Sequence, residues 1–134
     1  MEKKVFSPEY VTLVNKIISD RQTGAEEFGL KSSLNLPQGD YAVKTGTSRE
    51  YHDSWTVGFT LDFTVGVWVG NADNTPMHGV SGVDGAAPIW HDFMQAGHHN
   101  LPQRTFIRPA ALVEMDICAP SGLLATPDCP QVVR

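Results

Sequence analysis

Three absences narrow what this chain can be. Its longest apolar stretch, residues 63–69, is far shorter than the roughly 20 residues of a membrane-spanning helix, so the sequence predicts no membrane span. Residues 1–8 carry charges but no apolar core or small-residue cleavage site, and so do not resemble a signal peptide. The chain has 10 Lys and Arg against 15 Asp and Glu, with no basic block beyond Lys3 and Lys4, so nucleic acid is not an expected partner.

Cysteine is scarce as well. Cys118 and Cys129 lie near the C-terminus, next to prolines and a nearby glycine. This setting is typical of a loop closed by a disulfide, with free thiols as the alternative, whereas two cysteines alone make a poor metal site. His91, His98 and His99 belong to or follow one predicted helix, but no carboxylate or cysteine completes a regular zinc spacing. We therefore expect no metal ion and no cofactor.

The remaining composition is that of a globular protein. The chain has 134 residues, of which 41% are hydrophobic and 19% charged, enough for one domain with a buried core. Ser7 and Pro8 are typical of a helix start, and the apolar period that follows predicts a helix to about Asp20. Between Arg21 and Asp40 the period is lost and glycine and proline recur, so the pattern predicts a long surface loop.

From residue 41 the pattern changes to that of strands. Extended runs at 41–47, 55–60 and 63–69 predict a three-stranded antiparallel sheet whose last two strands form a hairpin. Residues 86–97 predict a second helix. The fold class is therefore α/β, in the α+β sense: an antiparallel sheet of about three strands flanked by helices.

Aromatic and aliphatic residues indicate where the core should lie. Alternation places Trp55, Val57 and Phe59 on one face of a strand, and the helical period makes Ile89, Trp90 and Phe93 the buried stripe of the second helix. The tryptophans, Trp68 included, follow these patterns, so we expect them in the core rather than on a sugar-stacking platform.

The most informative run lies on the first predicted strand and comprises Lys44, Thr45, Gly46, Thr47 and Ser48. Lys-Thr-Gly on a strand is one signature of the serine acyl-transferases that act on D-Ala-D-Ala peptides and β-lactams. A lysine ammonium stabilises a developing oxyanion and attracts the substrate carboxylate. Two threonine hydroxyls can donate to that carboxylate, and a glycine between them leaves room for close approach.

Further segments extend this signature over almost the whole chain: 43–48, 53–60, 65–71 and 79–90, with 28–30 and 34–37 upstream. Together they resemble the C-terminal half of the transpeptidase domain of class A penicillin-binding proteins, and residues 79–90 with the upstream segments narrow the resemblance to the 1C group. Residues 118–130 are similar to the start of that group's extra C-terminal domain. The resemblance implies a partial penicillin-binding-protein and β-lactamase-like transpeptidase fold.

The resemblance also implies a role for each residue of the signature. Lys44 would complete the hydrogen-bond network of the active site, and Thr45 and Thr47 would bind the carboxylate of the substrate or β-lactam. The backbone N–H of Thr47 would supply one of two oxyanion donors, which makes Lys44 and Thr47 the catalytic candidates. Gly46 would admit the substrate, and Ser48 is a further candidate donor.

The family's nucleophile motif is missing. The family needs a Ser-x-x-Lys nucleophile and a Ser-x-Asn element, both far upstream of Lys-Thr-Gly, and no serine of this chain has lysine three residues later. Residues 33–35 spell Ser-x-Asn, but they lie close to Lys44 in a segment that matches another part of the family, so we take them as a coincidence. We expect one wall of an acyl-transfer site without its nucleophile, inactive on its own.

Two other functions stay open. One is a non-catalytic peptidoglycan-binding or interaction module that has the fold without the chemistry. The other is a hydrolase that uses Ser48 with the neighbouring His52 and Asp53, although adjacent residues seldom supply the geometry of a triad.

The resemblance divides the chain into residues 1–97, the C-terminal half of the transpeptidase domain, a linker at 98–109, and the start of a small C-terminal domain at 110–134. The parent would be a periplasmic D,D-transpeptidase, with its inner-membrane anchor and glycosyltransferase domain outside these residues. Its partners would be D-Ala-D-Ala stem peptides, β-lactams and the missing N-terminal half of the domain. Exposed edges would also favour self-association.

Overall fold

The computed structural model describes residues 5–29, 31–37 and 39–133. Residues 1–4, part of the segment without signal-peptide features, lie outside this description. The elements in order are α1 (Pro8–Ser19), α2 (Arg21–Phe28), β1 (Ala42–Thr47), the 3-10 turn η1 (Arg49–Tyr51), β2 (Asp53–Phe59), β3 (Thr64–Gly70), α3 (Ala86–His98), β4 (Ile117–Cys118), β5 (Leu123–Leu124) and β6 (Val132–Val133). Among the described residues, no helix is both long enough and apolar enough to cross a bilayer.

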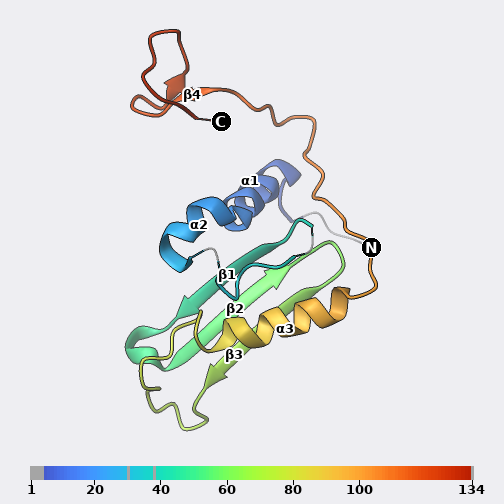
Figure 1. The fold of residues 1–134 in the computed structure, drawn as a ribbon, viewed down its shortest axis with the longest axis vertical. Coiled ribbons are helices and arrows are strands. Elements are labelled where there is room, and N and C mark those ends of the chain that lie inside the picture. The colour runs from blue at the N-terminus through green and yellow to red at the C-terminus, as the bar shows by residue number, and fades with distance from the viewer. Residues whose placement is uncertain (1–4, 30, 38, 134) are drawn as a thin grey trace.

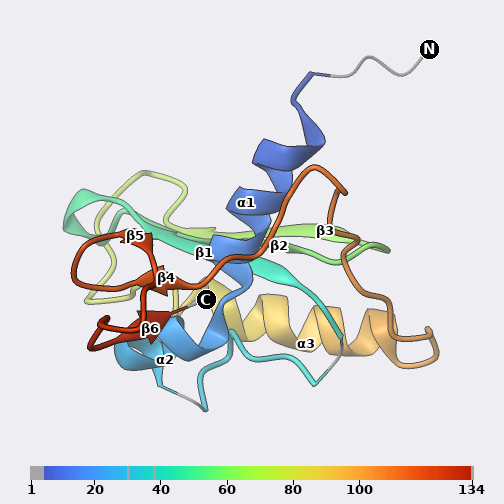
Figure 2. The ribbon, with the colours of Figure 1, turned by 90° about the horizontal axis from the view of Figure 1, so that it is seen from above.

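The main sheet is antiparallel in the order β1-β2-β3, as the strand patterns predict. Helix α3 packs against this sheet and α1 lies beside β1 (Figures 1 and 2). The predicted fold class, an antiparallel sheet flanked by helices, is confirmed. Helix α1 also forms where expected, but its apolar stripe is exposed, with Val14 and Ile17 at 55% and 73%.

The segment after α1 departs from the predicted surface loop. Residues 21–28 form α2 because Asp20 caps it: the Asp20 carboxylate accepts the backbone N–H groups of Gln22 at 3.0 Å and Thr23 at 3.1 Å. Further along, Leu34 and Leu36 are buried in the core. The prediction of one long surface loop is therefore wrong, since a capped helix and two core leucines lie within it.

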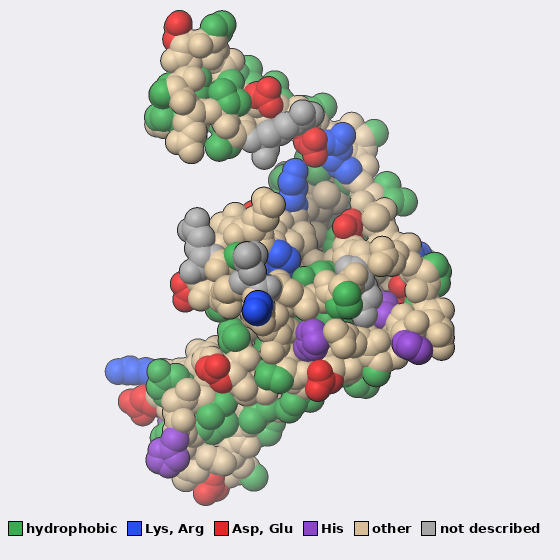
Figure 3. Space-filling view, in the orientation of Figure 1, with side chains coloured by type: hydrophobic (Ala, Val, Ile, Leu, Met, Phe, Trp, Pro, Cys, Tyr) green, Lys and Arg blue, Asp and Glu red, His purple; other side chains and the backbone are tan. Residues whose placement is uncertain are grey.

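The core lies between α3 and the sheet. Trp90 is fully buried, together with Met94 one turn later, and Gly58 on β2 provides the space for the indole. A Cβ added at Gly58 would lie 2.4 Å from Trp90 Cζ2. The expectation that Ile89 and Phe93 belong to the buried stripe is wrong: they are 54% and 57% exposed, because they lie on the side of α3 that faces away from the sheet. Hydrophobic side chains are accordingly visible at the surface over α3 (Figure 3).

Strand β2 buries its small side chains and exposes its large ones. Ser54, Thr56 and Gly58 alternate beneath α3. Trp55 and Trp68, paired across β2 and β3, lie on the opposite face and are 45% and 44% exposed. The expectation that all tryptophans are in the core is right for Trp90 and wrong for these two, because the bulk of α3 needs a strand face of small residues.

The C-terminal segment forms a small sheet of its own, in the order β5-β4-β6. A disulfide joins Cys118 and Cys129, whose Cα atoms are 5.7 Å apart. The hydrophobic residues of β5 and β6 are exposed. This unit lies at the end of an extended stretch that leaves α3 (Figure 1).

Candidate functional site

The Lys-Thr-Gly run forms the second half of β1, at the edge of the sheet. Side chains alternate along a strand, so Thr45 and Thr47 share one face and Lys44 and Gly46 the other. The register agrees: Thr47 is paired with Ser54 and Lys44 with Val57. The structure thus brings the two threonines together and sets Lys44 on the opposite face of the strand.

A glycine-rich loop, residues 79–85, rests on the threonine face. The backbone N–H of Gly82 donates to Thr47 Oγ1 at 2.8 Å. A Cβ at Gly82 would lie 2.9 Å from Thr45 Cβ and 2.8 Å from the Trp55 carbonyl oxygen. The loop approaches β1 this closely because the residue at position 82 has no side chain.

The two threonines open onto a cavity of about 380 Å³. Glu27, Phe28, Ser81, Gly82 and Val83 complete its lining. Hydroxyl groups and a backbone loop therefore line one side, and the end of α2 lines the other. Hydroxyls of this kind can bind a carboxylate group by donating hydrogen bonds to it.

Lys44 lies in a neighbouring cavity of about 350 Å³, between β1 and the two N-terminal helices. Its Nζ donates to the Thr45 carbonyl oxygen at 2.6 Å. Thr45 and Phe28 line both cavities, so the two spaces adjoin. The structure places Lys44 next to the threonine cavity, though not within it.

Ser48 belongs to the tight turn between β1 and β2. Its hydroxyl accepts the backbone N–H of Asp53 at 2.7 Å, and its own N–H donates to the Asp53 carbonyl oxygen at 3.0 Å. Glu50 and Tyr51 in this turn have positive φ values of 59° and 60°, in the left-handed region. Ser48 thus closes the turn, whereas Thr45 and Thr47 open onto the cavity.

The neighbouring His52 does not form a triad with Ser48. Nδ1 of His52 donates to the Asn74 carbonyl oxygen at 2.6 Å, and Nε2 faces the Glu50 carboxylate at 3.8 Å. Both ring nitrogens therefore face other residues, and this arrangement gives no support to a hydrolase that uses Ser48.

Asp53 takes part in the same turn. Its pKa is lowered, first because the Trp68 indole N–H donates to its carboxylate at 2.8 Å, then because the Ser48 hydroxyl does so. The carboxylate is therefore held in its charged form as a fixed part of the turn.

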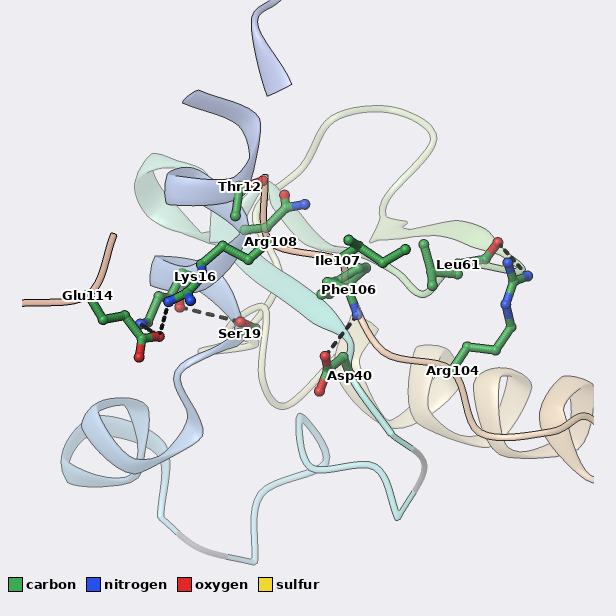
Figure 4. A pocket seen from close by; sticks show the side chains of 11 residues that line it. Thr12, Lys16, Ser19, Asp40, Leu61, Arg104, Phe106, Ile107, Arg108 and Glu114 are labelled. Atoms are coloured by element: carbon green, nitrogen blue, oxygen red, sulfur yellow. Dashed lines mark hydrogen bonds and ion pairs between the residues drawn. The ribbon is translucent and has the colours of Figure 1, made fainter. Parts of the chain in front are cut away.

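A larger cavity, about 620 Å³, lies at the other end of β1 (Figure 4). Its charged residues already have partners: Glu114 pairs with Lys16 at 3.4 Å and with Arg108 at 3.0 Å, and Arg104 pairs with Asp62 at 2.8 Å. The Asp40 carboxylate, moreover, accepts the backbone N–H of Phe106 at 2.9 Å. These contacts fasten residues 104–114 to the body, so the threonine cavity is the better candidate site despite its smaller size.

Several residues of the site could not be singled out from the sequence. Ser54, Thr56, Ser81 and Gly82 come together only because the loop before α3 folds back over β1 and β2. The sequence did contain one signal: small residues, Ser54, Thr56 and Gly58, occupy alternate positions of β2, a pattern typical of a strand face that packs closely against another element. Among the described residues, His, Cys, Asp and Glu form no group of three or more suited to a metal ion.

Known proteins resemble the chain over nearly all of its length. No protein-family profile matches it. Penicillin-binding protein 1A of Clostridium botulinum (strain Langeland) is 32% identical over 124 residues, 92% of this chain and 14% of that protein. Penicillin-binding protein 1C of Escherichia coli K12 is 28% identical over 125 residues, 91% of this chain and 15% of that protein.

A solved structure shares the fold. The crystal structure of penicillin-binding protein 1A from Haemophilus influenzae superposes with a TM-score of 0.79 and 24% identity, covering 96% of this chain and 20% of that one. By sequence similarity the chain corresponds to a segment of the penicillin-binding proteins, and it shares the fold of that segment in the Haemophilus influenzae structure. Within that class its relatives include the class A types 1A and 1C, which confirms the resemblance seen in the sequence; the choice of 1C over 1A stays a prediction.

Proposed function

We propose that these residues form the Lys-Thr-Gly wall of a peptidoglycan D,D-transpeptidase site, where Thr45 and Thr47 bind the carboxylate of a D-Ala-D-Ala peptide or a β-lactam. The observation that carries this proposal is the pair of threonines on one face of an edge strand, open to the same cavity. The similarity to penicillin-binding proteins supports the same chemistry. The chain spans only 14% and 15% of two of these relatives, so the activity belongs to a larger assembly.

Lys44 supplies positive charge next to this carboxylate site. Its ammonium group donates a hydrogen bond to the carbonyl oxygen of Thr45, a residue that also lines the cavity. In the assembled site we assign it to the hydrogen-bond network around the nucleophile, and we assign the Thr47 backbone N–H to the developing oxyanion. Ser48 is the weakest candidate donor, because the turn already engages its hydroxyl.

Gly46 fits the role of admitting the substrate. A Cβ at this position would meet the Trp55 Cβ at 3.7 Å, an ordinary contact. Packing within the chain therefore does not require glycine here, unlike at Gly58 or Gly82. We propose that the glycine leaves room for the substrate along the strand edge, on the Lys44 face of β1.

Covalent catalysis needs an activated nucleophile, and this chain does not contain the family's nucleophile motif. A serine acyl-enzyme forms when an activated serine attacks a carbonyl carbon, and no Ser-x-x-Lys sequence is present. We propose that the serine belongs to a periplasmic, membrane-anchored parent. We also propose the division at residues 1–97, 98–109 and 110–134. The expected result with fluorescent penicillin is no covalent adduct on the purified chain, and an adduct would contradict this part of the proposal.

Carboxylate binding can be tested on the chain itself. We expect an NMR titration with N-acetyl-D-Ala-D-Ala to perturb residues around Thr45 and Thr47, and its C-terminal amide to bind more weakly. Thr45→Val and Thr47→Val should each weaken binding of the acid about fivefold, the magnitude of one hydrogen bond. Thr64→Val, an exposed β3 threonine, is the matched control. Equal binding of acid and amide to the unmodified chain would overturn the proposal.

The absence of Ser-x-x-Lys favours one second candidate: a reversible peptidoglycan-binding module without catalysis. A pull-down with purified peptidoglycan would distinguish it, since a module of this kind is retained without any acylation partner. Loss of retention in Thr45→Val would place that binding at the same cavity.

A further inference from the structure

We propose that Ser54 and Gly82 are positioning residues for Thr47. In this view a directed chain of hydrogen bonds, the relay, runs from the N-terminus of α3 through Ser54 and the Ser81–Gly82 peptide to the Thr47 hydroxyl. The relay fixes that hydroxyl as a donor toward the cavity. This inference rests on the proposed function, in which Thr47 binds a carboxylate.

The first step of the relay is buried. The backbone N–H of Ala86, the first residue of α3, donates to Ser54 Oγ at 3.1 Å, and Ser54 Oγ donates to the Ser81 carbonyl oxygen at 2.8 Å. An amide can only donate and a carbonyl can only accept, so the chemistry fixes the direction of both bonds. Ser54 and Ala86 are both 0% exposed, so water does not compete for these bonds.

The second step crosses one peptide group. The Ser81 carbonyl and the Gly82 N–H belong to the same peptide, and that N–H donates to Thr47 Oγ1. The Ser81 carbonyl also accepts the backbone N–H of Gly85 at 2.9 Å. Two donors thus polarise this carbonyl, which makes the N–H at the other end of the peptide a stronger donor.

Every donor in the relay points toward Thr47. A hydroxyl group that accepts a strong hydrogen bond donates its own proton more readily, and the relay begins at the positive end of a helix dipole. Because Gly82 occupies one lone pair of Thr47 Oγ1, the Thr47 proton is directed to another acceptor. Thr47 is exposed, so that acceptor is solvent or a bound carboxylate.

Two features hold the loop that carries the relay. Gly82 provides the close approach, since a Cβ there would meet backbone oxygens of Trp55 at 2.8 Å and Gly46 at 3.0 Å. The Gly82 carbonyl accepts Thr56 Oγ1 at 3.1 Å and the backbone N–H of Ala87 at 3.0 Å. This carbonyl belongs to the next peptide, so Thr56 anchors the loop without entering the relay.

This difference provides a matched pair of variants. Ser54→Ala and Thr56→Val each remove one buried hydroxyl that donates to a loop carbonyl, and each carbonyl keeps a second donor. Only Ser54→Ala breaks the relay. We expect Ser54→Ala to move the Gly82 amide proton upfield and to weaken binding of N-acetyl-D-Ala-D-Ala about twofold to fourfold, consistent with modest cooperativity. Binding of the C-terminal amide should change less, and Thr56→Val should leave the acid-to-amide ratio unchanged.

Ser54→Cys keeps the volume and weakens the donor, so it is the second variant if Ser54→Ala does not fold. Its expected shift of the Gly82 amide proton has the same direction and a smaller size. An unchanged Gly82 shift in either folded variant, or an equal fall in acid and amide binding, would overturn the relay. The amide shift needs no ligand, so it tests the relay even if the chain binds no peptide, a result that would instead count against the proposed function.

Discussion

The two faces of the main sheet are built in opposite ways. The face under α3 buries small side chains of the strand, Ser54, Thr56 and Gly58, against one large residue of the helix, Trp90. The other face carries large residues, Trp55 and Trp68, which remain half exposed. Size therefore does not indicate burial here. On the covered face the strand residues pack against α3. On the exposed face the apolar side chains are left uncovered by any described element.

Replacing a tryptophan on each face gives the largest expected contrast. Trp90→Ala leaves a cavity at the centre of the core and should lower the free energy of unfolding by about 3–5 kcal/mol. Trp55→Ala removes a half-exposed ring and should cost about 1 kcal/mol. Equilibrium urea unfolding of both variants measures the difference, and similar losses would show that the two faces are equally packed.

A glycine pair tests the space on each face. Gly58→Ala would place a methyl group 2.4 Å from the Trp90 ring and should cost about 1–3 kcal/mol. Gly66→Ala would meet only the Val57 side chain at 3.7 Å and should stay within about 0.5 kcal/mol of the original chain. The same urea measurement applies. A larger loss in Gly66→Ala would contradict the contrast.

The exposed face should promote self-association. Trp55, Val57 and Trp68 share this face. Strand β3, an edge strand without charged residues, forms one of its borders. Val57→Glu places a charge at its centre, opposite Lys44 on β1, and should weaken association about tenfold while changing the free energy of unfolding by less than about 0.5 kcal/mol. Sedimentation velocity over a concentration series measures this. A strictly monomeric unmodified chain would contradict the prediction.

The smallest expected effect concerns Asp53, where the exposed face meets the β1–β2 turn. The folded pKa lies below the unfolded value of about 3.9, so this interaction stabilises the fold above that pH and is lost as pH falls through the folded pKa. Trp68→Phe removes the main donor and should raise the pKa of Asp53 toward its ordinary value. A carbonyl-carbon NMR titration measures it. Asp73, whose pKa is lowered by Thr75, is the internal control and should not move.

The sequence predicted the strands, the hairpin and both predicted helices because these follow from local periodicity. Its prediction of the buried strand face was wrong, because Trp55 and Trp68 were expected in the core. Alternation places Trp55 and Ser54 on opposite faces of the strand without showing which face meets the helix. The answer depends on tertiary packing, which sets Trp90 over Gly58. Helix α2 was missed for a different reason: Asp20 caps a short segment that lacks an apolar period.

The residues of the candidate site likewise fall into those that could be named from the sequence and those that depend on the tertiary fold. Thr45 and Thr47 could be named from a motif and from the alternation of one strand. Gly82 could not, because its hydrogen bond to Thr47 spans 35 positions of the chain and depends on the path of the loop. Lys44 could be named from the same motif, and strand alternation places its side chain on the face opposite the threonines, while its role stays a prediction.

The bridge between Cys118 and Cys129 makes one part of the chain depend on its chemical surroundings. The bridge links β4 to the turn before β6. Every strand of this unit is two residues long, and the leucines and valines of β5 and β6 face solvent, so the burial of apolar surface contributes little to its order. A reducing agent should therefore loosen the C-terminal unit while the main sheet, which contains no cysteine, keeps its structure. The same molecule would have one region whose order responds to oxidation and another that does not.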